Sequence, residues 1–550
     1  MIFRIFCFLL LIQTNVYASA LFSTYQLPPF ERAPKDSSAS NAVKNSQVMQ
    51  RIHAQQLAFS NIDDPDIFNQ RLLQEIQSKL NIQFEQNYYF SGKTTQELNE
   101  LLQSISAKIN IYITSSQLLF NNPIYLPSHI KLQGNQTYIV NTNDQDNVFI
   151  AENKQNFAIS GFKIKNANIA VYIKNCQQFE LSQLQLDNNQ RGIVVQGKTQ
   201  FGKIEENIIK SSKNSGLSLI GSVEKLLIQH NSIVDGADYF NWHAGLVLTD
   251  TPLNSMLTNE ETYNRLAVET AIHEANLTTP RFNIIQHNII QDNKASGIYM
   301  DGGVENIIQN NQLTENDKEG LCLDGGSALN IIRFNQITSN GFRQRQTDHD
   351  LRLDFVFDFG KLADGSSTAK LPGISLDNAA YNVILSNSVQ NNAGDGIKIV
   401  RSGFRNLLLF NSILSNNQGE NSQFHFFGIL LGSAVTDNPA DQGLYDFLPS
   451  IENIVVGNSI YGQHFSAILL DKQTEFNDIY NNTMYQFRYA PIESASQRFN
   501  SIVDNLWPEK TVQLVSCYKH WFWLGIIIFF SLAMLILILQ TIIIIKLRYK

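Results

Sequence analysis

The sequence predicts an all-β protein built as a right-handed parallel β-helix, a solenoid in which each coil stacks on the coil before it. Two short phrases carry this prediction: Asn-apolar-apolar-x-x-Asn, and Gly-apolar-x-apolar. Where nothing is inserted, each phrase returns after 23 or 24 residues, as from Asn288 to Asn311 and from Asn311 to Asn335. A period in this range, with strand-like alternation and no helical face, is typical of a stacked β-solenoid.

Each repeat unit accounts for one coil. Residues such as Ile298, Tyr299 and Met300 alternate inward, outward and inward, which predicts a strand with one buried face. The Gly that precedes each strand is expected to permit a sharp bend without a Cβ penalty. Because the second Asn of the other phrase falls at the same place in successive coils, we expect these side chains to hydrogen-bond to one another and to turn backbone.

Composition agrees with a solenoid and narrows the partners. The chain has 550 residues, of which only 16% are charged, and a formal net charge of −8. This length is enough for a large core, which a solenoid spreads along its axis. No basic stripe appears, which argues against nucleic acid as a partner. Cys7 lies in a segment predicted to be removed, and the three other cysteines are expected to be free thiols.

Both ends carry targeting patterns. Residues 1–20 combine Arg4, an apolar run and a small-residue cleavage site, which predicts a secretory signal peptide; an uncleaved anchor is the alternative. Residues 521–545 are apolar and long enough to span a bilayer as one helix. The basic residues that follow predict a cytoplasmic tail, so the solenoid is expected on the periplasmic or extracellular side. A tail cleaved during sorting would give a similar pattern.

The predicted organisation has seven segments. The helices of the third segment, expected at residues 65–80 and 94–107, would cover the unpaired strand edges at the open end of the solenoid. In chain order the segments are a signal peptide (1–20), a polar linker (21–61), a helical cap region (62–106), the β-helix (107–505), a juxtamembrane linker (506–520), a transmembrane helix (521–545) and a basic cytoplasmic tail (546–550).

The start of the solenoid adds a resemblance. Residues 109–113 and 123–134, with their apolar strand, Pro-Ser turn and Leu-x-Gly strand, resemble the opening coils of pectate-lyase-like proteins. With the repeats, the chain resembles the pectate-lyase-like right-handed β-helix superfamily over roughly residues 107–505. The resemblance implies polysaccharide lyases, glycoside hydrolases or uronate epimerases, and also non-catalytic adhesins. The motif sets of polygalacturonases and mannuronan epimerases are absent, so the resemblance predicts a fold and no single activity.

Aligning the Gly phrases singles out a column of acidic residues. Asp301, Asp324 and Asp377 fall above one another in three successive coils, about 4.8 Å apart per coil. Stacked carboxylates repel unless a cation or a shared proton intervenes, which makes the column a candidate catalytic or Ca²⁺ site. The alternative is that each Asp caps an ordinary turn. Lys398, one coil further, and Arg401 at the end of the same strand are candidate bases; the alternative for both is a solvated surface charge.

Three further residues are candidates for substrate binding. Tyr299 is a possible sugar-stacking platform, or simply a surface aromatic. His243 precedes the coil of the acidic column, and His349 belongs to an insertion, although a turn and a solvated loop are the alternatives for these two. Long insertions on a rigid solenoid usually wall a binding groove, and three are predicted here, at about 251–282, 341–371 and 433–450.

Two catalytic schemes fit these residues. In one, the column holds Ca²⁺, which binds a uronate carboxylate while Lys398 or Arg401 removes the C5 proton, giving β-elimination or epimerisation. In the other, two aspartates serve glycoside hydrolysis, with retention for neighbouring coils and inversion for a separation of about 9–10 Å. The sequence therefore predicts a membrane-anchored, exported protein acting on a polysaccharide, with lyase or epimerase favoured over hydrolase. A non-catalytic glycan-binding, adhesin or scaffold protein is the rival class.

Overall fold

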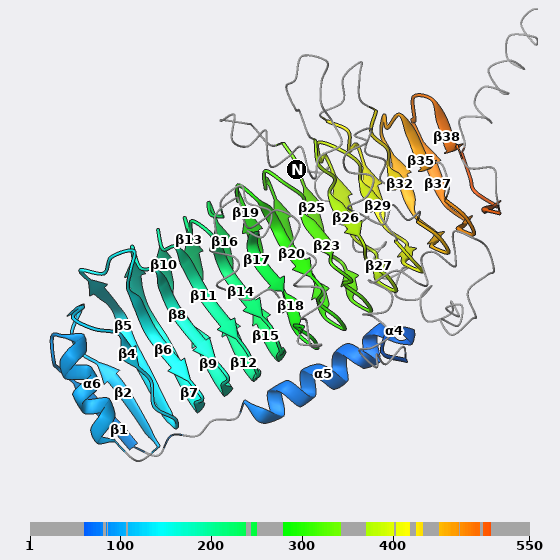
Figure 1. Cartoon of the computed structure of the whole chain (residues 1–550). Coiled ribbons are helices and arrows are strands. Elements are labelled where there is room, and N and C mark those ends of the chain that lie inside the picture. The colour runs from blue at the N-terminus through cyan, green and yellow to red at the C-terminus, as the bar shows by residue number, and fades with distance from the viewer. Residues whose placement is uncertain are drawn as a thin grey trace, which may run out of the picture.

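The computed structural model shows a parallel β-solenoid whose coils stack along one axis (Figure 1). Pairing is parallel between each coil and the next. The described residues are 60–80, 84, 86–105, 108–237, 244–249, 279–342, 370–400, 403–418, 425–432, 450–471, 474–495 and 499–507.

One side of the solenoid is a 13-stranded sheet within the described residues, which we call sheet B. It carries the strands that follow the Gly of each repeat. From the N-terminal end its strands are β4 (Ile124–Tyr125), β6 (Asn147–Glu152), β8 (Ile169–Lys174), β11 (Arg191–Gln196), β14 (Ser215–Ile220), β17 (Ala244–Thr249), β20 (Ser296–Asp301), β23 (Leu321–Asp324), β26 (Ile374–Asp377), β29 (Ile397–Val400), β32 (Ile429–Leu431), β35 (Ser466–Leu470) and β38 (Ala490–Ser494).

The other two sides are joined into one sheet because β5 and β7 are long enough to run along both. Face A1 consists of β1 (Gln86–Phe90), β2 (Ile109–Ile113), β5 (Ile130–Val140), β7 (Gln155–Lys165), β9 (Gln177–Ser182), β12 (Thr199–Glu205), β15 (Val223–Gln229), β18 (Ile284–Gln286), β21 (Ile307–Gln309), β24 (Ile331–Arg333), β27 (Val383–Leu385), β30 (Leu407–Leu409), β33 (Ile454–Val456), β36 (Asp478–Tyr480) and β39 (Ser501–Val503). Face A2 consists of β3 (Gln117–Leu119), the ends of β5 and β7, β10 (Gln185–Asp187), β13 (Ile208–Lys210), β16 (Ser232–Val234), β19 (Ile289–Gln291), β22 (Gln312–Thr314), β25 (Gln336–Thr338), β28 (Ser388–Gln390), β31 (Ser412–Leu414), β34 (Ser459–Tyr461) and β37 (Thr483–Tyr485).

The predicted Asn columns are confirmed. Asn288 Nδ2 donates to Asn311 Oδ1 and to the carbonyl of Ile228, each at 3.0 Å, and the Asn288 backbone N–H donates to the same Oδ1 at 3.0 Å. Each such amide therefore links three coils, and its own buried polar atoms are hydrogen-bonded. A third column, not singled out by the repeat phrases, runs from Asn293 to Asn416 and ends at His464, whose Nε2 accepts from the Asn416 N–H at 3.2 Å.

The repeat glycines have a different purpose from the predicted one. Gly297 and Gly320 do not have positive φ, whereas the bends before the Asn columns use non-glycine residues there, such as His287 (φ 55°) and Phe334 (φ 55°). A Cβ on Gly320 would lie 2.5 Å from the Ile337 side chain and 2.9 Å from an Asn amide nitrogen. These glycines are needed because a core side chain and an Asn column occupy the space that their Cβ would take.

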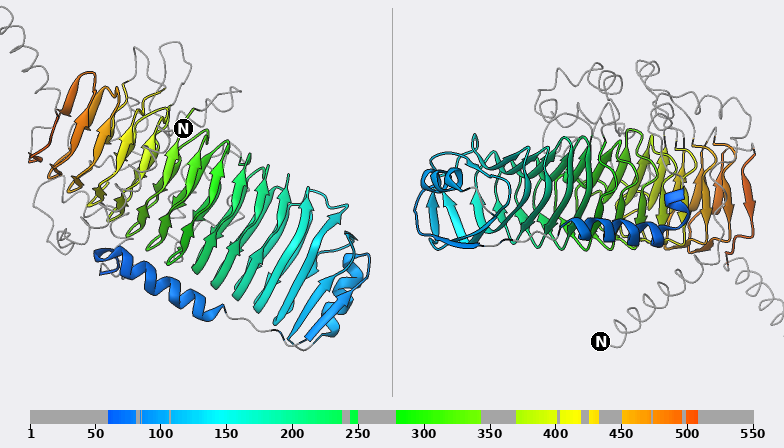
Figure 2. Two further views of the ribbon diagram at one scale, coloured as in Figure 1. Left: turned by 180° about the vertical axis from the view of Figure 1, so that it is seen from behind. Right: turned by 90° about the horizontal axis from the view of Figure 1, so that it is seen from below.

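The helices divide the predicted cap into two parts. α6 (Thr95–Ser104) lies at the N-terminal end of the solenoid and buries Leu98 and Leu102, whereas α4 (Ser60–Asp63) and α5 (Pro65–Lys79) lie along face A1 (Figures 1 and 2). α5 does not cover an open end because its apolar stripe packs on the outward isoleucines of face A1. Strand pairing also begins at β1, inside the region predicted as a helical cap.

No helix among the described residues is long and apolar enough to cross a bilayer. The predicted signal peptide (1–20), transmembrane helix (521–545) and cytoplasmic tail (546–550) lie outside the described residues. The last described strand, β39, ends close to the predicted C-terminal boundary of the solenoid at residue 505.

Candidate functional site on the outer face of sheet B

The strand register of sheet B confirms the predicted stacking. Asp301 of β20 pairs with Asp324 of β23, and Asp377 follows on β26, where Leu323 is paired with Leu376. The neighbouring outward column places the following residues in register, one per coil: Val247, Tyr299, Cys322, Ser375, Lys398, Leu430 and Leu469.

The first two aspartates of the column are held by neighbouring groups. Asp301 is only 7% exposed, and Thr249 Oγ1 donates to its Oδ2 at 3.4 Å. Asp324 accepts from the Gly325 N–H at 2.7 Å, so it does cap its turn, and its other oxygen accepts from Tyr299 OH at 3.3 Å. Asp324 therefore caps its turn, as one sequence interpretation predicts, and it also belongs to the outward acidic column, as the other predicts. Tyr299 is 7% exposed, which is too buried for an open sugar-stacking platform; it orients Asp324 instead.

The structure adds one acidic residue that the sequence alignment missed. Asp395 lies two residues before β29, is 6% exposed, and accepts from the Phe427 N–H at 2.6 Å. Burial raises the pKa of Asp395 to about 6, against the opposing influence of the nearby Lys398 charge and of the Phe427 N–H. A carboxyl that changes charge near neutrality, beside a half-buried lysine, is suited to proton transfer. The sequence feature that could have identified Asp395 is its position directly before Gly396. The alignment of repeats compares only the residues that follow each Gly.

Residues 169–337 match the family profile described as a right handed beta helix region. Over these residues the chain is similar to that family, in agreement with the parallel β-solenoid of the structure. Among solved structures, it is similar to the A-module of the mannuronan C-5 epimerase AlgE4 from Azotobacter vinelandii (12% identity, 76% of this chain and 100% of that chain, TM-score 0.47). It is also similar to a GH87 α-1,3-glucanase catalytic domain (12%, 78% and 69%, 0.42) and to PfbA, a surface adhesin of Streptococcus pneumoniae (12%, 73% and 91%, 0.37). These similarities concern the fold alone. No curated protein sequence matches the chain.

Three predicted site residues of this β-helix protein, Arg401, His243 and His349, lie outside the described residues. So do most of the three predicted insertions. Their described flanks are at the end of β17, before β26 and after β32, so the second insertion leaves the solenoid between the coils of Asp324 and Asp377.

The described part of the β-helix contains no group of three His, Cys, Asp or Glu side chains that could hold a metal ion. The column spreads over three coils, and both oxygens of Asp324 already accept hydrogen bonds. The donor set present therefore does not fit a compact calcium centre, and calcium dependence stays a prediction.

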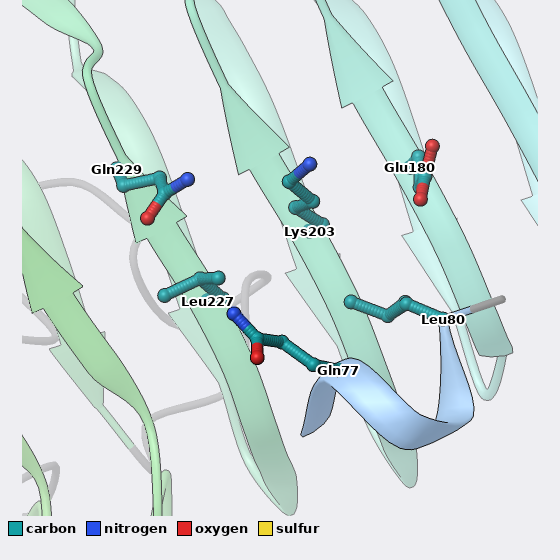
Figure 3. A pocket seen from close by; sticks show the side chains of 6 residues that line it. All are labelled: Gln77, Leu80, Glu180, Lys203, Leu227 and Gln229. Carbon is teal, nitrogen blue, oxygen red and sulfur yellow. The ribbon is translucent and has the colours of Figure 1, made fainter. Parts of the chain in front are cut away.

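Two hollows lie elsewhere on the solenoid. One, of about 460 Å³, is on the acidic column's own side of the solenoid, between α6 and the first strands of sheet B, and is lined by Tyr125, Glu152 and Lys154 among others. The second, of about 260 Å³, lies on face A1 beneath the C-terminal end of α5 (Figure 3). There Glu180 and Lys203 stand on neighbouring strands opposite Gln77 and Leu80. Only the first hollow shares a face with the acidic column.

Proposed function

We propose that this protein acts on a uronate-containing polysaccharide along the outer face of sheet B, as a lyase or an epimerase. The observation that carries the proposal is Asp395, a buried carboxyl with a pKa of about 6 close to Lys398. Its coil follows that of Asp377, and it lies at the other end of the sheet B strands from Asp301, Asp324 and Asp377. A buried carboxyl whose pKa is raised toward neutrality, on the face that also carries the acidic column, favours a functional site over ordinary turn capping.

The chemistry is the removal of the C5 proton next to a uronate carboxyl group. Lys398 is the proposed base, and Asp395 is the proposed acid that supplies or receives the second proton. In β-elimination, the C5–H and C4–O bonds break, a C4–C5 double bond forms, and the leaving oxygen takes a proton. In epimerisation, a proton returns to C5 from the opposite face and no bond to the next sugar is lost.

Glycoside hydrolysis is the second candidate because of the Asp301–Asp324 register. Carboxylates on neighbouring coils are about 4.8 Å apart along the axis, near the spacing of about 5–5.5 Å found in retaining glycosidases. Hydrolysis would give new reducing ends without a double bond, so the products separate the two reactions.

The test is a product assay with the purified protein on polyuronates and neutral glycans, in Ca²⁺ or in EDTA. We expect ultraviolet absorbance from the new double bond, or a change in C5 configuration by NMR. Lys398→Ala and Asp395→Asn should abolish turnover in proteins that still fold, with Asp395→Asn melting at or above the wild-type temperature at neutral pH, whereas Lys210→Ala, an exposed lysine on face A2, should leave turnover unchanged. No product from any glycan, with glycan binding retained, would instead support a non-catalytic glycan-binding protein.

Export and membrane anchoring are part of the proposal and are supported by the sequence patterns at residues 1–20 and 521–545. Cell fractionation tests this: the whole protein should sediment with membranes, and deletion of residues 521–550 should release it. Recovery of the whole protein in the cytosolic fraction would contradict both parts.

A further inference from the structure

Arg191 is a buried cation on the outer face of sheet B. It begins β11, in register with Ile169 of β8 and Ser215 of β14. This column faces outward, because Ile169 packs with Val194 and Ile220 in a cluster separate from the interior core. Arg191 is nevertheless only 2% exposed.

The Arg191 guanidinium lacks the carboxylate partners that two other largely covered arginines have. Arg405 pairs with Glu452 at 2.9 Å, and Arg333 pairs with Asp66 at 2.6 Å. By contrast, Arg191 Nη2 is sealed from solvent without any hydrogen-bond partner, and no carboxylate of the described residues pairs with this side chain. Burial alone lowers the pKa of Arg191 to about 10, with no acidic group opposing it.

An unpaired buried charge is costly, and proteins rarely keep one without a counter-ion. One substitution to an apolar residue of similar length would remove both the buried charge and its free-energy cost, yet the chain has an arginine at this position. The missing component is therefore an anion, and the planar guanidinium matches the two oxygens of a carboxylate or sulfate group.

We propose that Arg191 binds an acidic group of the glycan, carboxylate or sulfate, on the N-terminal side of the acidic column. This inference rests on the proposed function and names the charge of its substrate. β11 and β20 are three coils apart, about 14 Å along the axis, so Arg191 holds a sugar a few rings from the one beside Asp301. Because Arg191 is only 2% exposed, we expect only a small acidic group to enter beside the guanidinium, displacing the side chains that cover it, while the sugar ring stays outside.

Such an anchor answers an electrostatic problem. The chain carries a net charge of −8 and a column of carboxylates, which repel an acidic polymer. A single desolvated cation on the same face attracts one acidic group strongly, since low local polarity strengthens the pair. The 460 Å³ hollow that includes Lys154 lies further along this face in the same direction.

The test compares Arg191→Met with wild type in the full-length protein. Melting temperatures are measured alone and with a polyuronate oligosaccharide, a sulfated oligosaccharide and a neutral oligosaccharide of equal length. We expect an acidic oligosaccharide to raise the wild-type melting temperature. Whichever of the polyuronate and the sulfated oligosaccharide gives the larger increase shows whether Arg191 binds a carboxylate or a sulfate group. Arg191→Met should melt higher than wild type without ligand, and should bind the acidic oligosaccharide about ten- to a hundredfold more weakly.

The matched control is Arg405→Met, which removes an arginine whose side chain is 11% exposed and has a carboxylate partner. It should melt lower than wild type, because Glu452 loses the charge of Arg405, and should keep the response to the acidic oligosaccharide. If Arg191→Met instead melts lower and binds the acidic oligosaccharide as wild type does, Arg191 is a structural residue. If the melting temperature responds to the acidic oligosaccharide only when Arg191 is present, but no glycan gives a product, the anion site is supported and the proposed reaction is wrong. If Arg191→Met forms product as wild type does and binds the acidic oligosaccharide equally well, the proposed reaction is supported and the anion site is wrong.

Discussion

At the scale of single residues, two buried titrating groups oppose each other in the same pH range. Asp395 has a pKa raised to about 6 and His464 has a pKa lowered to about 4, and burial is the main cause for both. Neutral Asp395 favours the folded state at low pH, whereas neutral His464 favours it at high pH. Single substitutions should therefore tilt the pH dependence of stability in opposite directions.

For Asp395, the folded protein keeps the proton up to about pH 6, while the unfolded chain releases it near pH 3.8. The stability from this group is complete below the lower value and is lost as the pH rises through the higher one. Between pH 4 and 7 the wild-type free energy of unfolding should fall by about 3 kcal/mol because of this group, and Asp395→Asn should not show this fall. The Asn side chain can still accept a hydrogen bond from the Phe427 N–H. Urea unfolding across this range measures it, and a slope identical to wild type would contradict the assignment.

For His464, the sign is reversed. The unfolded chain takes up a proton near pH 6.5, but the folded protein resists until about pH 4, so stability is complete above 6.5 and falls as the pH drops. In His464→Gln, the amide oxygen can replace Nε2 as the acceptor for the Asn416 N–H. As the pH falls from 7 to 4, the free energy of unfolding of this variant should decrease by about 3 kcal/mol less than that of wild type. Equal acid sensitivity of the two proteins in urea unfolding would show that His464 is not the cause.

At the scale of elements, the repeat was sufficient to predict the strands, the inward and outward columns and the Asn stacking. It did not place α5, although a signal was present. In Asn283-Ile284-Ile285, one isoleucine faces the core and the other faces outward, and Ile284 is still fully buried. A strand apolar on both sides implies a covering element. The repeat phrases alone do not assign a covering element to this face, so the sequence predicts the helix at residues 65–80 at the open end instead.

The packing of α5 on face A1 gives a paired prediction. Leu72 is 3% exposed against the outward isoleucines, while Ile67 on the same helix is 61% exposed. Leu72→Ala should lower stability by about 2–4 kcal/mol through lost contacts and a cavity, whereas Ile67→Ala should change it by less than about 0.5 kcal/mol. Chemical denaturation of both variants checks this, and equal effects would mean that α5 is not packed as described.

At the scale of the whole molecule, the acidic column was predictable because the Gly phrases keep register through the insertions. Asp395 and Arg191 could not be predicted in this way. Asp395 is distinguished by its burial, and Arg191 by its burial without a carboxylate partner, and the repeat pattern determines neither property. Tyr299 illustrates the converse: its outward position was correct, but its exposure depends on the neighbours Ala244, Val247 and Cys322. A solenoid repeat thus predicts direction and register, while chemistry depends on what surrounds each outward residue.

The combined site predicts a dependence on glycan length. Arg191 on β11 and Lys398 on β29 lie on one face, six coils apart, or about 29 Å along the axis. A short acidic oligosaccharide can contact one of them, and a longer one contacts both in a single, effectively intramolecular, binding event. Dissociation constants from calorimetry should therefore fall with chain length until the glycan spans this distance and then level off. In Arg191→Met the same series should level off at a shorter length, with short oligosaccharides bound at the Lys398 end unaffected. A parallel loss of affinity at every length would show that the substitution disturbs the whole face, and no dependence on length in wild type would contradict an extended site.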